Sequence, residues 1–280
     1  MKEEAEVNHS FSLPLEWALK KVLGPTLETV GKDIQGLYEV GRDMIIRSAE
    51  NKVSEEDGKT ANLRVTRDVF WNGSYSNDEI SAEYFGGVLA SSRSDDGSDD
   101  SMVPIAETIK ALSSGQLKLH YLIYRSLNEL FVGRGIFLDV GRVSLMSTVK
   151  IWFFRSELEP LISSDFRTSL TILIRHGLIR SFDLKAHHEF GAIVMVVPTS
   201  YGIITYAAAH NRFSEWHEFS REHFGDFEGV DDELCFGGSP SELINRTCEE
   251  ESLVEEDGYW DDSDDSGCEE DEEDENTDKS

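Results

Sequence analysis

The chain has 280 residues, of which 39% are hydrophobic, so it can bury the core of one large domain or of two small ones. Its net charge is −29, and the stretch from Thr247 to Ser280 alone holds 18 Asp and Glu against one Lys, a net charge of −17. The rest of the chain is acidic as well, which disfavours nucleic-acid binding unless basic side chains gather on one face.

The cysteines and the first residues predict an intracellular protein. The three cysteines, Cys235, Cys248 and Cys268, are an odd and sparse set that does not suggest a disulfide framework, so we expect a reducing compartment. Residues 1–12 are polar and acidic and lack the pattern of a secretory signal. We expect them to form a flexible N-terminus and expect the protein to be cytoplasmic.

Region 13–132 is predicted to be helical. From Leu15 to Ile45 the apolar residues recur at steps of three and four, which is typical of an amphipathic helix or a helix pair, and Gly24-Pro25 interrupts the pattern. We interpret it as a core-facing helix. The alternative is an interfacial helix that binds a membrane or a partner. The polar stretch Ser48–Asn62 is predicted to be a linker.

Further helices are expected in the same region. They are a helix over Leu63–Trp71, a helix from the capping residue Asp78 to Ala90, a short helix around Ile105, and a long helix that begins at Ser113 or Ser114 and ends at Gly133 and Gly135. In the helix to Ala90 we expect a single apolar side, formed by Ile80, Tyr84, Val88 and Leu89. Arg93–Ser101 is expected to be an acidic loop.

The stretch from Asp165 to His210 predicts a helix, a glycine stop, a strand, a polar turn, a second strand and a second helix. A helix closed by the residues HGLI and followed by two strands is typical of a winged-helix module, which we place at 143–210. Within this module, Val143–Phe154 is ambiguous between helix and strand. The predicted fold class is therefore mainly α with a small β component (α+β).

Gly191–Ala209 approaches the length of a membrane span. Pro198 in its middle and the capping residue Thr199 instead favour a strand followed by a helix, so we expect no membrane partner. A C-terminal helix is expected at 211–228. Segment 229–280 is expected to be a disordered acidic tail, because it buries too little apolar surface to offset its ordering entropy.

Candidate contact residues follow from the winged-helix interpretation. In the helix from Asp165 to His176, the apolar residues Leu170, Ile172, Leu173 and Ile174 are expected to be mostly core. The residues expected to face nucleic acid are Arg167, Thr168, Thr171 and Arg175 on that helix and Arg180 and Lys185 on the following strand. DNA is thus one predicted partner, although this surface carries few positive charges for that role.

We predict no catalytic residue, no cofactor and no metal site. His187-His188 are neighbours on a predicted turn and would point to opposite faces of an extended segment, so they are not expected to share one ion. Gly133-Arg134-Gly135 follows a helix, whereas a phosphate cradle would precede one. His120 lies beside an apolar helix face and is expected to be a packing or hydrogen-bonding residue.

The acidic tail carries the aromatic pair Tyr259-Trp260 within the dense Asp and Glu run Glu249–Asp278. A solvated tail that aids solubility is the simpler interpretation. The alternative is a mimic of nucleic-acid charge, which would occupy either a basic partner or the protein's own basic face, with the aromatic pair as an apolar anchor.

The helical segments resemble the Abi-alpha (abortive infection alpha) family of bacterial proteins. The matching pieces are Gly24-Pro25, Gly31, the residues VLASS (Val88–Ser92) and the block ALSSGQLKLHYLIY (Ala111–Tyr124). The resemblance covers roughly residues 15–210 and depends on packing positions, so it transfers no catalytic residue. It implies a bacterial cytoplasmic protein associated with phage defence. The acidic tail departs from the shared region.

Three functions follow as hypotheses. The first is a non-enzymatic antiphage protein that acts through contacts with an unidentified protein of the host or the phage. The second is a winged-helix DNA-binding transcriptional regulator. The third is a membrane-active toxin that uses the N-terminal amphipathic helix. The oligomeric state is left open by the sequence.

Overall fold

A computed structural model describes residues 27–53, 57–73, 78–162, 165–187, 191–227 and 230. The helices are α2 (Leu27–Asn51), α3 (Leu63–Gly73), α4 (Glu79–Ser91), α5 (Val103–Lys110), α6 (Ser114–Arg134), α7 (Val143–Met146), α8 (Arg155–Leu158), α9 (Phe166–Arg175) and α10 (Ser200–Ala209), with 3-10 turns η2 (Glu159–Leu161) and η3 (Phe213–Ser220). The strands are β1 (Thr60–Ala61), β2 (Arg93–Ser94), β3 (Ile151–Phe154), β4 (Ile179–His187) and β5 (Gly191–Pro198). The predicted fold class, mainly α with a small β component, is confirmed.

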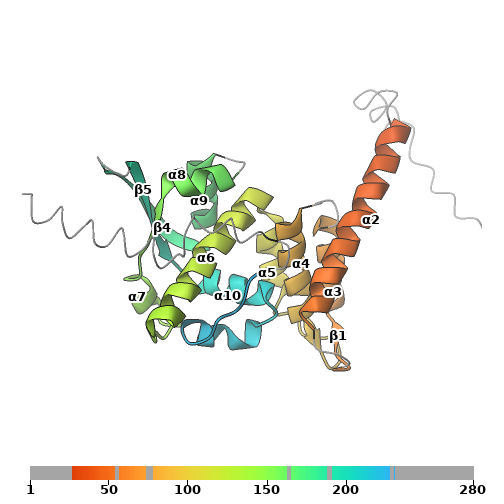
Figure 1. Cartoon of the computed structure of the whole chain (residues 1–280). Coiled ribbons are helices and arrows are strands. Elements are labelled where there is room, and N and C mark those ends of the chain that lie inside the picture. The colour runs from red at the N-terminus through yellow and green to blue at the C-terminus, as the bar shows by residue number, and fades with distance from the viewer. Residues whose placement is uncertain are drawn as a thin grey trace, which may run out of the picture.

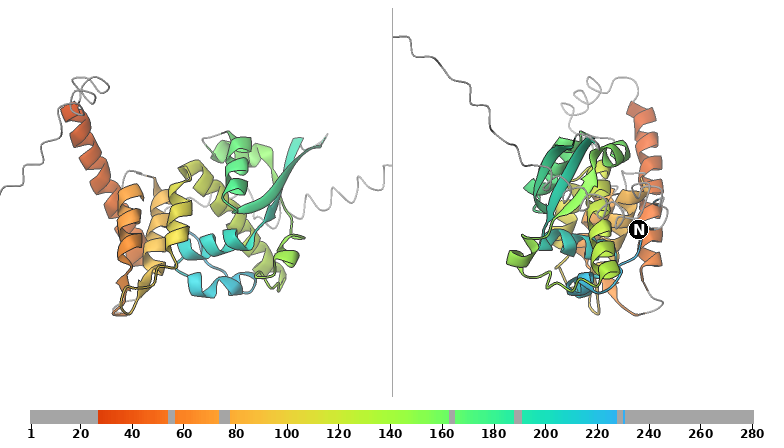
Figure 2. Two further views of the ribbon diagram at one scale, coloured as in Figure 1. Left: turned by 180° about the vertical axis from the view of Figure 1, so that it is seen from behind. Right: turned by 60° about the vertical axis from the view of Figure 1, so that its left-hand side comes forward.

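The two ends of the molecule differ in structure. Helices α2, α3 and α4 form one end, the hairpin β4–β5 forms the other, and α6 and α10 lie between them (Figures 1 and 2). The larger sheet is antiparallel in the order β3-β5-β4, and β1 pairs with β2 in a short separate ribbon. The hairpin is irregular between Ile179 and Ser181, where the register shifts.

Helix α4 is buried on nearly every side, so the prediction of a single apolar side was wrong. It packs against α2, α3, α6 and α10, whereas predicted Leu89 is only half-buried. Its Gly87 explains the close approach to α10, because a Cβ there would lie 1.8 Å from the carbonyl oxygen of Ala209. The predicted cap is confirmed, since the Asp78 carboxylate accepts a hydrogen bond from the Ser81 N–H at 2.9 Å.

The long helix α6 begins and ends as predicted. Ser113 and Gln116 form a reciprocal capping box at its start, and Gly135 adopts a left-handed conformation (φ 62°) at its end. The ambiguous stretch Val143–Phe154 contains both kinds of structure, namely the short helix α7 and the strand β3. The strand-to-helix prediction for Gly191–Ala209 is confirmed by β5 and α10.

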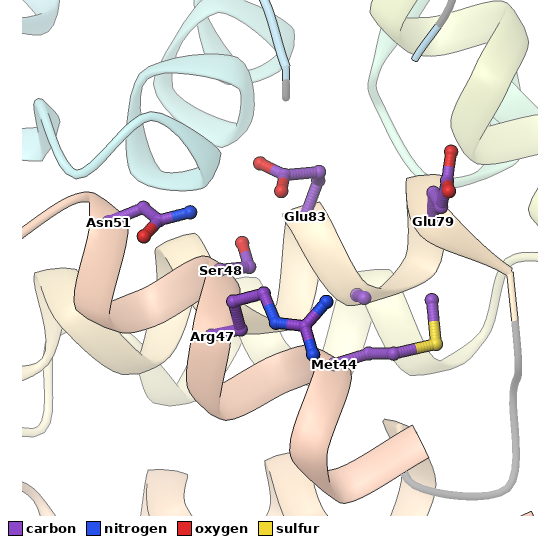
Figure 3. Close-up of a pocket in the computed structure, with 7 residues that line it drawn as sticks. Met44, Arg47, Ser48, Asn51, Glu79 and Glu83 are labelled. Carbon is purple, nitrogen blue, oxygen red and sulfur yellow. The ribbon is translucent and has the colours of Figure 1, made fainter. Parts of the chain in front are cut away.

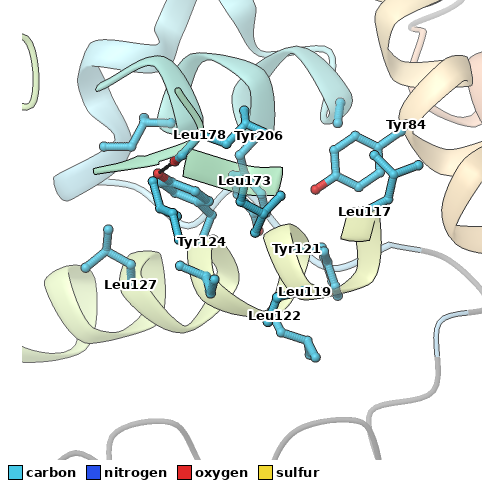
Figure 4. Packing of buried hydrophobic residues seen from close by; sticks show 14 of the residues in the cluster. Tyr84, Leu117, Leu119, Tyr121, Leu122, Tyr124, Leu127, Leu173, Leu178 and Tyr206 are labelled. Carbon is cyan, nitrogen blue, oxygen red and sulfur yellow. Dashed lines mark hydrogen bonds between the residues drawn. The ribbon is translucent and has the colours of Figure 1, made fainter. Parts of the chain in front are cut away.

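One continuous core joins the two predicted regions. Tyr84 of α4, Tyr121 and Tyr124 of α6 and Tyr206 of α10 are essentially inaccessible to solvent and belong to the same cluster (Figure 4). Phe219 of η3 is buried in that cluster as well. Helix α6 contributes from most of its circumference, so it is a central packing element rather than a surface helix.

The predicted helix at 211–228 is wrong in type and length. Asn211 has a positive φ of 56° and ends α10, and only the 3-10 segment η3 follows. The subsequent residues are held by Asn128 of α6, which donates to the carbonyls of Phe219 (2.6 Å) and Glu222 (2.9 Å) and accepts from the Phe224 N–H (3.0 Å). These bonds satisfy backbone groups that a continuous helix would have satisfied internally.

The linker prediction also needs correction. Helix α2 continues to Asn51, and Ser48 is buried where α2 crosses α4. Several predictions concern residues outside the described ranges: the flexible segment 1–12, the first part of the helix pair and most of the acidic tail 229–280.

Candidate functional site

The predicted contact residues of α9 share one exposed face. Asp165 caps this helix by accepting from the Thr168 N–H at 3.1 Å. Phe166, Leu170 and Leu173 are buried, which turns the opposite side to solvent. That exposed side carries Arg167, Thr168, Thr171 and Arg175, as predicted. Ile174 was expected to be mostly core but is 36% exposed, and Ile172 is half-buried, because α9 lies on the surface of α6 rather than between two layers.

On this face, the two arginines can offer all their side-chain hydrogen-bond donors to a ligand, whereas the two threonine hydroxyls already donate to other groups. The Thr168 hydroxyl donates to Asp165, and the Thr171 hydroxyl donates to the Arg167 carbonyl at 2.8 Å. Arg167 and Arg175 form no ion pair within the part of the chain that the structure describes. The two guanidinium groups can therefore contact an anion without first breaking an internal bond.

Strand β4 continues the basic face only in part. Arg180 is exposed beside the irregularity in the hairpin, but the carboxylate of Asp183 is exposed on the same strand. Lys185 lies on β4 opposite Ile193, and its side chain lies outside what the structure describes. The segment Gly133–His187 contains eight basic and five acidic residues, a net charge of +3 in a chain of −29. Basic charge therefore gathers in this half of the molecule.

The backbone that presents α9 and the hairpin is held by Tyr124. Its buried hydroxyl donates to the Leu178 carbonyl (Figure 4) and accepts from the Thr199 N–H at 3.0 Å. Burial raises the pKa of the Tyr124 phenol, so it stays protonated. Gly202 makes room for it, since a Cβ there would lie 2.0 Å from the phenol oxygen. No pattern in the sequence predicted these hydrogen bonds of Tyr124.

His120 is a structural residue. It is fully buried, its Nδ1 is hydrogen-bonded to the Tyr84 hydroxyl, and its ring lies against Tyr124. Burial lowers the pKa of His120 to about 3, so the imidazole is neutral at physiological pH. The prediction that His120 is a packing and hydrogen-bonding residue is confirmed.

A polar cavity of about 240 Å³ lies between α2 and α4 (Figure 3). It is lined by Met44, Arg47, Ser48, Asn51, Glu79, Ala82 and Glu83. The Glu83 carboxylate is not a free acid, because it pairs with Lys52, and the two side chains are only 8% and 12% exposed. The Lys52 Nζ also donates to the Ser48 hydroxyl (2.7 Å) and the Glu83 carbonyl (3.2 Å). This arrangement fastens α2 to α4. No sequence pattern predicted it.

A second, apolar groove of about 540 Å³ lies at the same end of the molecule. Its walls are Ile46, Ala49, Glu50 and Val53 of α2 and the following turn, Ala61 of β1, Thr66 and Phe70 of α3, Leu89 and Ala90 of α4, and Arg93 of β2. Beside it, Leu63 and Trp71 of α3 are 80% and 70% exposed. Leu63, Phe70 and Trp71 are here called the α3 stripe, because positions i, i+7 and i+8 lie on one side of a helix, although Thr66 and Arg67 lie between Leu63 and the other two.

The other predictions on possible sites have mixed outcomes. Gly133-Arg134-Gly135 ends a helix, as expected, so it offers no helix N-terminus to a phosphate. The side chains of His187-His188 lie outside the described residues. Within the described ranges, no group of three His, Cys, Asp or Glu side chains is placed to hold a metal ion, and no helix has the length and hydrophobicity needed to cross a membrane.

Comparisons with protein-family models, with curated proteins and with solved structures found no match to this chain.

Proposed function

We propose that this protein is a non-enzymatic docking protein of the abortive-infection type, which acts in phage defence by binding another protein. The link to phage defence comes from the Abi-alpha resemblance. The docking role is supported by the α3 stripe and the apolar groove beside it. Large apolar side chains exposed next to a groove are typical of protein–protein contact sites.

The chemistry of this end of the molecule favours a protein partner. The arginines around the groove are already paired with carboxylates: Arg64 with Asp100, Arg67 with Asp68, and Arg93 with Asp57. The carboxylates of these pairs would repel a phosphate, whereas apolar side chains could cover Leu63, Phe70 and Trp71 directly. The partner that fits is therefore a protein with an exposed apolar face, such as an amphipathic helix, whose residues would contact the groove at helical spacing.

The test is phage plating on a sensitive host that expresses the full chain. Wild-type protein should reduce plating of at least one phage in a diverse panel, and Leu63→Ser combined with Trp71→Ser should abolish the reduction. Val40→Ser is the matched control, because Val40 is 54% exposed on α2 but does not line the groove, and it should keep the reduction. Unchanged plating across the panel with the wild-type protein would refute the defence role. Full protection by the Leu63 and Trp71 double variant would refute the docking site.

A second candidate is a winged-helix DNA-binding regulator. Its support is the order helix α6, strand β3, helices α8 and α9, hairpin β4–β5, with the strand order β3-β5-β4. In a winged-helix interpretation α9 would be the recognition helix, and the exposed Arg167 and Arg175 would contact phosphates or guanine. The net charge of the chain opposes this function. If duplex DNA is bound at low salt, Arg167→Ala with Arg175→Ala should weaken it, and unchanged binding would remove this candidate.

A further inference from the structure

The connection between α6 and α7 exposes apolar and basic side chains together. Phe137, Val143 and Ile136 are 72%, 66% and 39% exposed, and the side chains of Arg134 and Arg142 beside them are exposed as well. These five residues are here called the α6–α7 surface. Of the large apolar side chains in the described residues, few others are exposed to this extent.

The backbone under this surface is held in place. The Ile136 N–H donates to the Phe131 carbonyl at 2.8 Å. The Ser220 hydroxyl accepts a hydrogen bond from the Leu138 N–H at 3.1 Å and donates one to the Leu138 carbonyl at 2.9 Å. The Ser200 hydroxyl donates to the Val140 carbonyl at 2.6 Å. The apolar side chains therefore point outward from an ordered scaffold, and burying them in a contact would require little loss of backbone entropy.

The charge of the α6–α7 surface is positive and unpaired. Arg134 and Arg142 make no ion pair within the described ranges. The nearest acid in sequence is Asp139, whose carboxylate accepts the Gly141 N–H at 3.1 Å. The surface thus combines exposed apolar side chains with two guanidinium groups that form no ion pair within the described ranges, and it suits a ligand that is both apolar and anionic.

We propose that the acidic C-terminal segment of the same chain, Thr247–Ser280, binds the α6–α7 surface. Tyr259-Trp260 would bury against Phe137 and Val143, and the carboxylates on both sides of this pair would face Arg134 and Arg142. The segment has a net charge of −17 and carries an aromatic pair with Asp or Glu on either side, which is the complement of an apolar patch flanked by arginines.

The geometry allows this contact within one molecule. Phe227, near the last described residue, stacks on Tyr121 of α6 with ring centroids 4.5 Å apart. Arg134 lies thirteen residues further along α6, about 20 Å away along the helix axis. Tyr259 follows Val230 by 29 residues, and flexible-chain statistics for that separation would give an average span of about 30 Å and an effective concentration of order mM.

Other occupants satisfy fewer of these features. An anionic membrane or a nucleic acid offers negative charge, but the chain's −29 repels both at a distance, whereas its own segment is covalently held nearby. A second copy of the chain could supply the same segment, and only concentration dependence separates the two arrangements. The contact does not depend on partner binding at the α3 stripe.

The test uses the native cysteines, all three of which lie beyond residue 230. In the full chain, Cys235→Ser with Cys248→Ser leaves Cys268 for a nitroxide label, eight residues from Trp260. Paramagnetic broadening of amide signals should concentrate on residues 134–150 and stay constant over a tenfold range of protein concentration. The diamagnetic reference is the same sample after reduction of the nitroxide.

Variants at the proposed contact and a control pair on the α3 stripe test which residues the acidic segment contacts. Phe137→Ser with Val143→Ser, or Tyr259→Ala with Trp260→Ala, should remove the broadening, and Arg134→Gln with Arg142→Gln should weaken it at least several-fold. Leu63→Ser with Trp71→Ser should leave it unchanged. The proposal would be overturned by broadening that is centred on α9, that grows with protein concentration, or that survives loss of Phe137 and Val143. The absence of localised broadening would also overturn it. Because the substituted body residues are exposed, unchanged urea midpoints will show that the fold is intact.

Discussion

Replacing Tyr124 by Phe should destabilise the protein although the ring stays in place. The buried hydroxyl donates to the Leu178 carbonyl and accepts from the Thr199 N–H, so it joins the turn before β4 to the turn after β5. The Leu178 carbonyl keeps a second donor, the Thr199 hydroxyl at 3.0 Å. Among the described residues the Thr199 N–H has no such substitute, so it loses its partner in a partly buried position.

The magnitude follows from that asymmetry. An orphaned buried donor costs about 1–3 kcal/mol, and the weakened carbonyl adds to it, so we expect a loss of about 2–3 kcal/mol in the free energy of unfolding. For a folded body of this size the melting temperature should fall by about 4–10 °C. The loss should be measured by urea unfolding of the full chain with a circular-dichroism readout.

Tyr201→Phe is the matched control. Its hydroxyl also makes a hydrogen bond, to the Thr108 hydroxyl at 2.8 Å, but Tyr201 is half-buried and water can replace the partner. We expect a loss below about 1 kcal/mol for this control. A Tyr124→Phe variant that loses less than about 0.5 kcal/mol, or no more than Tyr201→Phe, would refute the idea that this hydroxyl supports the hairpin.

Three further predictions concern the core. Gly87→Ala should cost more than about 3 kcal/mol because the added Cβ would clash with the backbone of α10. Gly133→Ala, which has open space around it in α6, should instead stabilise the protein by about 0.5–1 kcal/mol, and equal urea midpoints for the two variants would contradict the close packing of α4 on α10. Glu83→Ala should cost about 3 kcal/mol by removing the carboxylate that pairs with the buried Lys52, and adding Lys52→Met should restore part of that loss, which a double-mutant cycle will measure. Burial lowers the pKa of His120 from 6.5 in the unfolded chain to about 3 in the folded protein. Its contribution to the free energy of unfolding is therefore complete above pH 6.5 and is lost as pH falls toward 3, by about 1.4 kcal/mol per pH unit. The urea midpoint of His120→Gln should vary less with pH over that range than the wild-type midpoint, and an identical pH profile would contradict this assignment.

Local signals in the sequence predicted local structure well. Asp78, Ser113 and Thr199 cap the helices that were predicted to follow them, and Gly135 ends α6 in the left-handed conformation. Each of these depends on hydrogen bonds or steric freedom within a few residues, so neighbours in the chain are enough to specify them. The exposed face of α9 also followed from local periodicity, since its buried residues repeat at helical spacing.

Errors arose where distant contacts outweighed local pattern. The predicted helix at 211–228 is replaced by η3 and an irregular segment because Asn128, about ninety residues earlier, satisfies the backbone there. Helix α4 is surrounded on nearly all sides, which a one-sided apolar pattern did not show. In both cases the partner lies on another element, and one-dimensional periodicity carries no information about it.

The sequence by itself determined the helical class, the helix ends, the strand-to-helix turn at Pro198 and the concentration of acid after Thr247, because each depends on short-range chemistry or on composition. Only the tertiary structure decided which side chains remain exposed. It buries His120 and the Lys52–Glu83 pair, and it leaves Trp71, Phe137 and Val143 in solvent. Exposure depends on which elements pack against one another, and that is set by contacts between residues far apart in the chain.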